Sequence, residues 1–233
     1  MSKKNKIKQK TTGFDIVYRV VTALIAVAMY PMFYFANLFT IEIRHTQISD
    51  LLNKFNGGDT LHITHESFSL ATMSDWIEVL SKFTNESFDF KTQILQNELY
   101  RPFVVAVIFV AIALVIGLVI IGFAAFSNKT KVVIGLSAAG FLCTIISNVS
   151  FGILAKPLVA GETSLSDLFN IDGVIASQVI SLLGEVSIFT LDTAFYGVMF
   201  SMLAILIWSA SVLIVNKSEE KEKALKEAAR KNR

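Results

Sequence analysis

FVVAVIFVAIALVIGLVIIGFAAF, residues 103 to 126, decides the fold of this 233-residue chain. It holds 24 residues without a charge, and 17 of them are Leu, Ile, Val or Phe. A membrane-spanning helix needs about 20 apolar residues. On the insertion scale, those 17 residues contribute at most about 5 to 10 kcal/mol toward entering a bilayer. The stretch is therefore predicted to be a transmembrane helix.

Three more apolar blocks predict three further spans. The whole chain is 53% hydrophobic and 17% charged, whereas a soluble domain carries about 25% charged residues. A cleaved signal peptide is the alternative for the first block, but its apolar stretch far exceeds the usual length of about 7 to 15 residues. The predicted spans are 16–39, 102–126, 132–155 and 193–215.

Basic and acidic residues fall in different segments between these spans. The leader (1–15), the turn (127–131) and the tail (216–233) hold 14 of the 21 Lys and Arg residues. The two long loops, 40–101 and 156–192, hold 14 of the 19 acidic residues. Because Lys and Arg near span ends stay on the cytoplasmic side, both termini are predicted to be cytoplasmic and both loops to face outward.

The cysteine content bears on how the outer loops hold their shape. Cys143 is the only cysteine and lies inside an apolar block, so no disulfide can form within the chain. We expect Cys143 to be a small packing residue. The chain is also rich in Lys, Asn, Ile and Phe. This bias and the disulfide-free loops favour a bacterial plasma membrane.

The first loop carries its own folding pattern. Residues 60–70 are rich in β-branched and aromatic side chains, which favours an extended segment. Residues 73–83 have helical periodicity, with Trp76 on the apolar face. The predicted fold class is an all-α membrane protein: a four-helix transmembrane bundle with a small α+β extracytoplasmic cap formed by the two outer loops.

The second loop contains an apolar segment, 173–184, that is too short to span a bilayer. We expect a short helix near 173–185 that lies outside the membrane core and runs nearly continuously into the fourth span. A re-entrant segment and a fifth span are the alternatives. An odd number of spans would place the seven basic residues of the tail outside.

The sequence offers few residues for chemistry. His62, His65 and Glu66 are close together, but a structural metal site needs three or four ligands in a fixed geometry. On a strand, the two histidines would point to opposite faces. We therefore expect no metal site, no cofactor and no catalytic residue.

Weak candidates for polar or partner contacts come from the spans and loops. Charge inside a membrane usually marks function, yet the middles of the four spans contain none. Asn148 is expected to form an interhelical hydrogen bond, and the alternative is a polar path between the third and fourth spans. The candidates are Asn148, Ser177, Gln178, Glu185, Asp192 and Trp76.

Two further predictions concern the packing of the helices and the C-terminal tail. Small residues spaced four apart permit close helix approach. The tail reads as a polar helix, either a solvated extension of the fourth span whose positive charge fixes the topology or a segment that contacts anionic lipid. Nucleic-acid binding is not expected, because four acids are interspersed. The small-residue pairs are Ala113/Gly117, Gly135/Ala139 and Gly197/Ser201.

The layout of a long first outer loop, a tight inner turn and a shorter second outer loop resembles the claudin-type tetraspan arrangement. Those proteins carry paired cysteines with a tryptophan in the first loop. This chain has no cysteine there, so the resemblance concerns layout and assigns no residue a role.

Three functions are compatible with these patterns. The first is a non-enzymatic accessory or interaction subunit, whose cap meets a membrane-protein partner or a second copy, besides the lipid bilayer. The second is a small transporter or channel, and the third is a membrane-embedded enzyme. A packed apolar core, a polar conduit and convergent ionisable groups in a cleft would distinguish them.

Overall fold

The computed structural model describes five segments of the chain, which form four long helices and one three-stranded sheet. The segments are 13–44, 63–72, 101–127, 129–162 and 185–231. The helices are α1 (Gly13–Phe35), α4 (Arg101–Phe126), α5 (Thr130–Val159) and α8 (Thr193–Lys231). The strands are β1 (Asn37–Arg44), β2 (Ile63–Ser69) and β3 (Glu185–Leu191).

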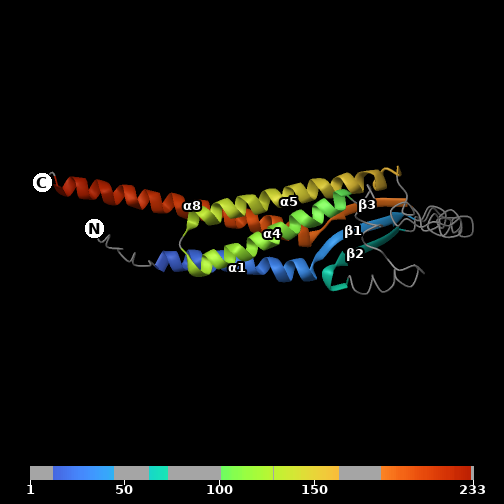
Figure 1. Ribbon diagram of the computed structural model, residues 1–233, viewed down its shortest axis with the longest axis horizontal. Coiled ribbons are helices and arrows are strands. Elements are labelled where there is room, and N and C mark those ends of the chain that lie inside the picture. Colours follow the sequence, from blue (N-terminus) through green and yellow to red (C-terminus); the bar gives the residue numbers. More distant parts are fainter. Residues whose placement is uncertain (1–12, 45–62, 73–100, 128, 163–184, 232–233) are drawn as a thin grey trace, which may run out of the picture.

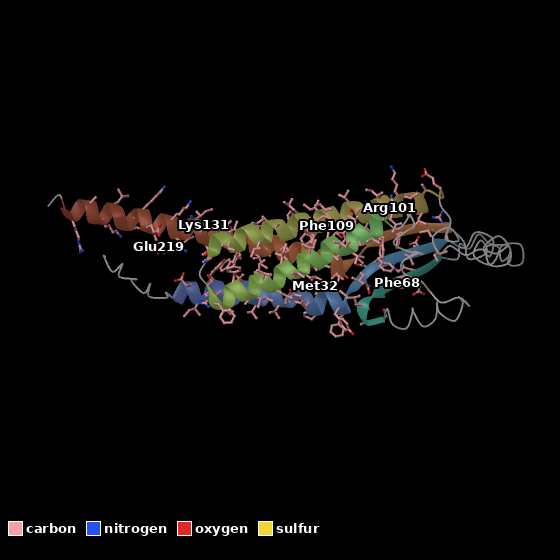
Figure 2. The ribbon with its side chains drawn as sticks, in the orientation of Figure 1. Met32, Phe68, Arg101, Phe109, Lys131 and Glu219 are labelled. Carbon is pink, nitrogen blue, oxygen red and sulfur yellow. The ribbon has the colours of Figure 1, made fainter. Side chains whose placement is uncertain are left out.

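The helices form an elongated bundle with the sheet at one end (Figure 1). The start of α1 and the last described residues of α8 lie toward the opposite end, which we call the terminal end. Arg101 and Phe68 lie at the sheet end, whereas Lys131 and Glu219 lie toward the termini (Figure 2). All four helices are long and apolar enough to cross a membrane, and α4 has the highest mean hydropathy, 3.5. The prediction of a four-pass integral membrane protein is therefore supported.

Two segments that were expected to be helical are strands. The first span was predicted to reach residue 39, but α1 ends at Phe35 and β1 begins at Asn37. The nearly continuous helix before the fourth span is wrong for Glu185–Leu191, which forms β3. Apolar and polar side chains alternate from Phe39 to Arg44 and from Glu185 to Ile188, and this period of two favours a strand. Residues 173–184 lie outside the described segments.

The other loop expectations are tested in part. β2 confirms an extended conformation within residues 60–70. The helix expected at 73–83 falls outside the described residues. α5 extends to Val159, beyond the predicted end of the third span at residue 155. The polar tail is helical, because α8 continues without a break to Lys231.

The sheet has the order β2-β1-β3, and both pairs are antiparallel. One face is aromatic: the ring of Phe39 stacks on that of Phe68 at 4.8 Å and meets the ring of Phe189 edge-on at 5.7 Å. Phe189 in turn contacts Phe151 of α5 at 4.8 Å. The aromatic face therefore packs the sheet onto the sheet end of α5.

Methionines and glycines form the centre of the bundle. Met29 of α1 and Met202 of α8 are fully buried in the largest apolar cluster. A Cβ atom at Gly117 of α4 would clash with Met29, and one at Gly140 of α5 would lie 2.8 Å from Met202 Sδ. Flexible methionine side chains fill irregular gaps well. The helices therefore approach closely where glycine makes room for a thioether.

The predicted small-residue pairs differ in their surroundings. Ala113 and Gly117 are buried in the bundle. At Gly197 an added Cβ would clash with Met32. Gly135 is exposed, and an added Cβ would meet nothing within 4 Å. Small residues four apart thus mark helix contacts on α4 and α8, but not at Gly135 of α5 within the described chain.

Candidate functional site: the polar junction between sheet and helices

Single residues join the sheet to two of the spans. Only Ala36 separates α1 from β1, and only Asp192 separates β3 from α8. The Ala36 N–H donates to Met32 O at 2.9 Å, and the Asp192 N–H donates to Leu38 O at 2.9 Å. β1 and β3 are paired with each other. The two strands are therefore direct continuations of two helices, without an intervening loop.

Asp192 holds this junction together through its side chain. Its Oδ1 accepts the N–H of the next residue, Thr193, at 2.6 Å, and its Oδ2 accepts the Thr40 hydroxyl at 2.5 Å. Asp192 stands at the N-cap position of α8, because its carbonyl oxygen accepts the Phe195 N–H at 3.0 Å. Thr40 Oγ1 also lies 3.1 Å from Ser67 Oγ. Because the single Thr40 proton is directed to the carboxylate, Ser67 is the donor in that second contact. The chain of bonds links β2 and β1 to the start of α8.

The surroundings of Asp192 favour the ionised form. The hydrogen bond from Thr40 lowers the pKa of Asp192 below its ordinary value, and bonds from Thr193 and Asn37 act in the same direction against partial burial. The positive end of the α8 dipole also favours a negative charge at this position. Asp192 is thus a carboxylate at neutral pH, and it acts here as a hydrogen-bond acceptor.

A second polar cluster lies on the same sheet face. Ser187 Oγ donates to Glu42 Oε1 at 2.7 Å and also approaches Glu42 O at 3.2 Å. His65 Nδ1 is 3.9 Å from Glu42 Oε2, and 62% of the His65 side chain is exposed. The Ser187 proton points at a carboxylate, so the serine is not paired with the imidazole as an activated nucleophile would be. The geometry suits cross-strand bonding and an exposed recognition surface.

Alternation along β1 and β2 collects most of these groups on one face, and Ser187 joins them at the register shift between β1 and β3 beside Glu42. Thr40 and Glu42 are two residues apart on β1, so their side chains share a face, and Phe39 points to the other. Cross-strand pairing sets Ser67 opposite Thr40 and His65 opposite Glu42. We call this surface the polar sheet face. It comprises Thr40, Glu42, His65, Ser67 and Ser187.

The candidate residues from the sequence lie in different parts of the structure, and some lie outside the described residues. Asp192 is central to the junction. Glu185 begins β3 opposite Arg44, and its side chain is not described. Asn148 is half-buried on α5 and hydrogen-bonds to no described residue, whereas the adjacent Ser147 Oγ donates to Ala106 O at 2.5 Å. Three candidates fall outside the described residues: Trp76, Ser177 and Gln178.

Sequence reasoning missed most of the polar sheet face. Thr40, Glu42 and Ser187 carry no motif, and His65 was considered only as a metal ligand. Among the described residues, no group of three or more His, Cys, Asp or Glu side chains could hold a metal ion. The sequence signal that could have revealed this face was the alternation of apolar and polar residues within 37–44 and 185–191.

Three buried hydroxyl groups inside the bundle bond to the backbone of their own helix, whereas the hydroxyls of Tyr18 and Ser209 bond to each other between α1 and α8 at 3.1 Å. Thr22 Oγ1 donates to Tyr18 O at 2.8 Å, Thr144 Oγ1 to Phe141 O at 2.7 Å and Ser137 Oγ to Ile134 O at 3.1 Å. Such bonds to the preceding turn of the same helix satisfy a hydroxyl without a partner from elsewhere. Within the described chain, these three groups do not link into a polar path.

Arg19 links α1 to α4 at the terminal end of the bundle. Its Nε donates to Ala124 O at 2.7 Å, and its Nη2 donates to Ala125 O. These carbonyls belong to the last turn of α4, where no further helical N–H is available. The α1 guanidinium thus caps the C-terminus of α4 at the terminal end.

Comparisons with known proteins found no relative. No protein-family model, no curated protein and no solved structure matches the chain. The function must therefore be argued from the geometry: a polar sheet face held rigidly on two spans, and a bundle core of apolar side chains.

Proposed function

We propose that the chain is a non-enzymatic accessory or interaction subunit of a membrane, and that its sheet end forms an extracytoplasmic cap presented to a partner protein. The observation that carries this proposal is the junction, where β1 and β3 continue α1 and α8 and Asp192 binds Thr40. A surface fixed in this way loses little conformational entropy when it binds.

Exposed side chains on the sheet support the same function. His65 is largely exposed, and Ile188 of β3 is 39% exposed. An apolar side chain beside hydrogen-bonding groups is common at the edge of protein interfaces. The charge distribution along the sequence supports an outward sheet end, because the termini at the other end carry most of the lysines and arginines.

The two other hypotheses have less support. A transporter would need a continuous polar path along the contact between α5 and α8, where the described apolar cluster includes Val133, Met202 and Ile205. The buried hydroxyl groups of Ser137 and Thr144 on α5 bond to the backbone of their own helix. An enzyme would need a proton donor or nucleophile in a cleft, whereas both Asp192 oxygens already accept hydrogen bonds. We therefore favour an interaction role.

Photo-crosslinking from the sheet tests the proposal. A photoreactive amino acid at position 65 or 188 should give adducts with one discrete membrane protein when the full-length chain is irradiated in cells. The control position is 126, because Phe126 is 90% exposed at the opposite end of the bundle. No adduct from the two sheet positions, with a chain that purifies alone and monodisperse in mild detergent, would refute the proposal.

The outward orientation has its own test. Single-cysteine variants H65C and S218C, in a C143S background, are treated in intact cells with a membrane-impermeant maleimide. We expect labelling of H65C alone, and labelling of S218C only after permeabilisation. Labelling of S218C in intact cells would reverse the orientation and remove the extracytoplasmic cap from the proposal.

A further inference from the structure

A groove opens on α8 where the helix leaves its apolar segment. Its volume is about 280 Å³, and the described residues that line it are Ile214, Lys217, Ser218 and Lys221. Two ammonium groups, a hydroxyl and an apolar side chain therefore share one helical face. The face continues one turn further with Leu225, whose side chain is 71% exposed.

The two lysines in this groove differ from a neighbouring basic residue. Lys226 Nζ bonds to Glu222 Oε1 at 2.6 Å, whereas Lys217 and Lys221 make no ion pair with any described residue. Among the tail acids whose side chains are described, Glu219 projects from the opposite side of the helix, and Glu222 is held by Lys226. Glu220 follows Lys217 by three residues and lies at one edge of the face. Like charges at i and i+4 repel each other, so this face gains stability from an anion between its two lysines.

The position of the groove indicates which anion can reach it. From Thr193 to Ile214 the helix rises about 32 Å, close to the roughly 30 Å thickness of a hydrocarbon core. Lys217 lies about 4.5 Å beyond Ile214 along the helix and Lys221 about 10.5 Å beyond it. A headgroup layer of about 5–7.5 Å on this side therefore contains Lys217, and the long side chain of Lys221 can reach back to its outer edge. The phosphate groups of lipids are concentrated at this depth.

We propose that this groove binds the headgroup of an anionic phospholipid in the leaflet nearer the termini. The Lys217 and Lys221 ammonium groups and the Ser218 hydroxyl contact the phosphate, and Ile214 packs against the first carbons of an acyl chain. The site goes beyond the proposed interaction role, since it concerns the opposite end of the molecule and does not require a protein partner.

Native mass spectrometry of the full-length protein in detergent tests the site. Phosphatidylglycerol is titrated in parallel with phosphatidylcholine, and the apparent dissociation constants are compared. The variant K217Q/K221Q should bind phosphatidylglycerol about 10- to 30-fold more weakly than the unmodified chain. The matched control K226Q/R230Q removes the same charge from other sides of the tail helix and should change the affinity by less than about twofold.

Three results would overturn the proposal. Equal losses in the two double variants would mean that the tail attracts lipid through its total charge. An unchanged affinity in K217Q/K221Q would mean that the groove is not the site. Equal affinities of the unmodified chain for the two lipids would exclude recognition of an anionic headgroup. All four groove residues project from one helix surface, so the variants should keep the thermal midpoint of the parent.

Discussion

In the bundle, methionine side chains fill the space beside glycines, and a cluster of apolar side chains occupies the centre. At the sheet end, one carboxylate and two hydroxyls join three strands to a helix. The bundle is stabilised by many small dispersion contacts, which are not directional. The junction depends on a few directional bonds, so single substitutions there should release a local unit while the bundle persists.

The strongest test of this difference is Asp192→Ala. The change removes a helix N-cap, worth about 0.5–2 kcal/mol, and a hydrogen bond to a charged acceptor, worth about 1.5–3 kcal/mol. We expect hydrogen exchange in β1 and β3 to accelerate by two orders of magnitude or more, with little change in α4. Equal acceleration in α4 would mean that the sheet and the bundle unfold as one unit.

Gly117→Val tests the bundle in the same way. Its side chain would collide with Met29 and with the hydroxyl of Tyr30, and overpacking of this kind costs about 1–3 kcal/mol. The thermal midpoint in detergent should fall by several degrees. The matched control is Gly135→Val, where the added side chain meets nothing within 4 Å and the midpoint should stay within about one degree. Similar losses in both variants would contradict the close packing at Gly117.

Ser67→Ala should have a smaller effect at the junction. It removes the donor to Thr40 but leaves the bond from Thr40 to Asp192 in place. A hydrogen bond between neutral groups contributes about 0.5–1.5 kcal/mol, so exchange in β2 should accelerate about tenfold or less. A larger effect than that of Asp192→Ala would show that the carboxylate is not the centre of the cluster.

The smallest expected effect is on pH dependence. The pKa of Asp192 is lowered in the folded state, so its contribution to stability is present above the unfolded value, near 3.9. That contribution is lost as the pH falls through the folded pKa. The sheet should therefore keep its protection from pH 7 to about 4.5 and lose it only in stronger acid. Asp192→Asn should lack this acid step, and a step near neutral pH in the parent would contradict the assignment.

The four spans were predictable because a hydrophobic run is a local property, complete within each segment. The extended segment that contains β2 was also predicted, but β1 was not, because Leu38 and Phe39 extend the apolar block of the first span and hide the change of period. Pairing of β1 with β3 also joins residues far apart in the sequence, such as Thr40 and Thr190. Nothing local specifies such a partner.

The candidate site, like the fold, was predictable from the sequence only in part. Asp192 was a candidate because it is a charged residue at a span boundary, and the structure places it at the junction. Thr40 and Ser67 are ordinary hydroxyl residues whose role follows from strand register, which one sequence does not reveal. The pairing of Lys217 and Lys221 follows from helical spacing, but the groove beside them required coordinates.

The single-residue links at Ala36 and Asp192 have a mechanical consequence. A flexible hinge would absorb a change in the tilt of α1 relative to α8, but each of these links is only one residue long and is too short to do so. Because the two strands are hydrogen-bonded neighbours, such a tilt must slide one against the other or bend the whole sheet. Lateral pressure on the helices within the bilayer would thus change the shape of the sheet, because the paired strands transmit the tilt of the helices.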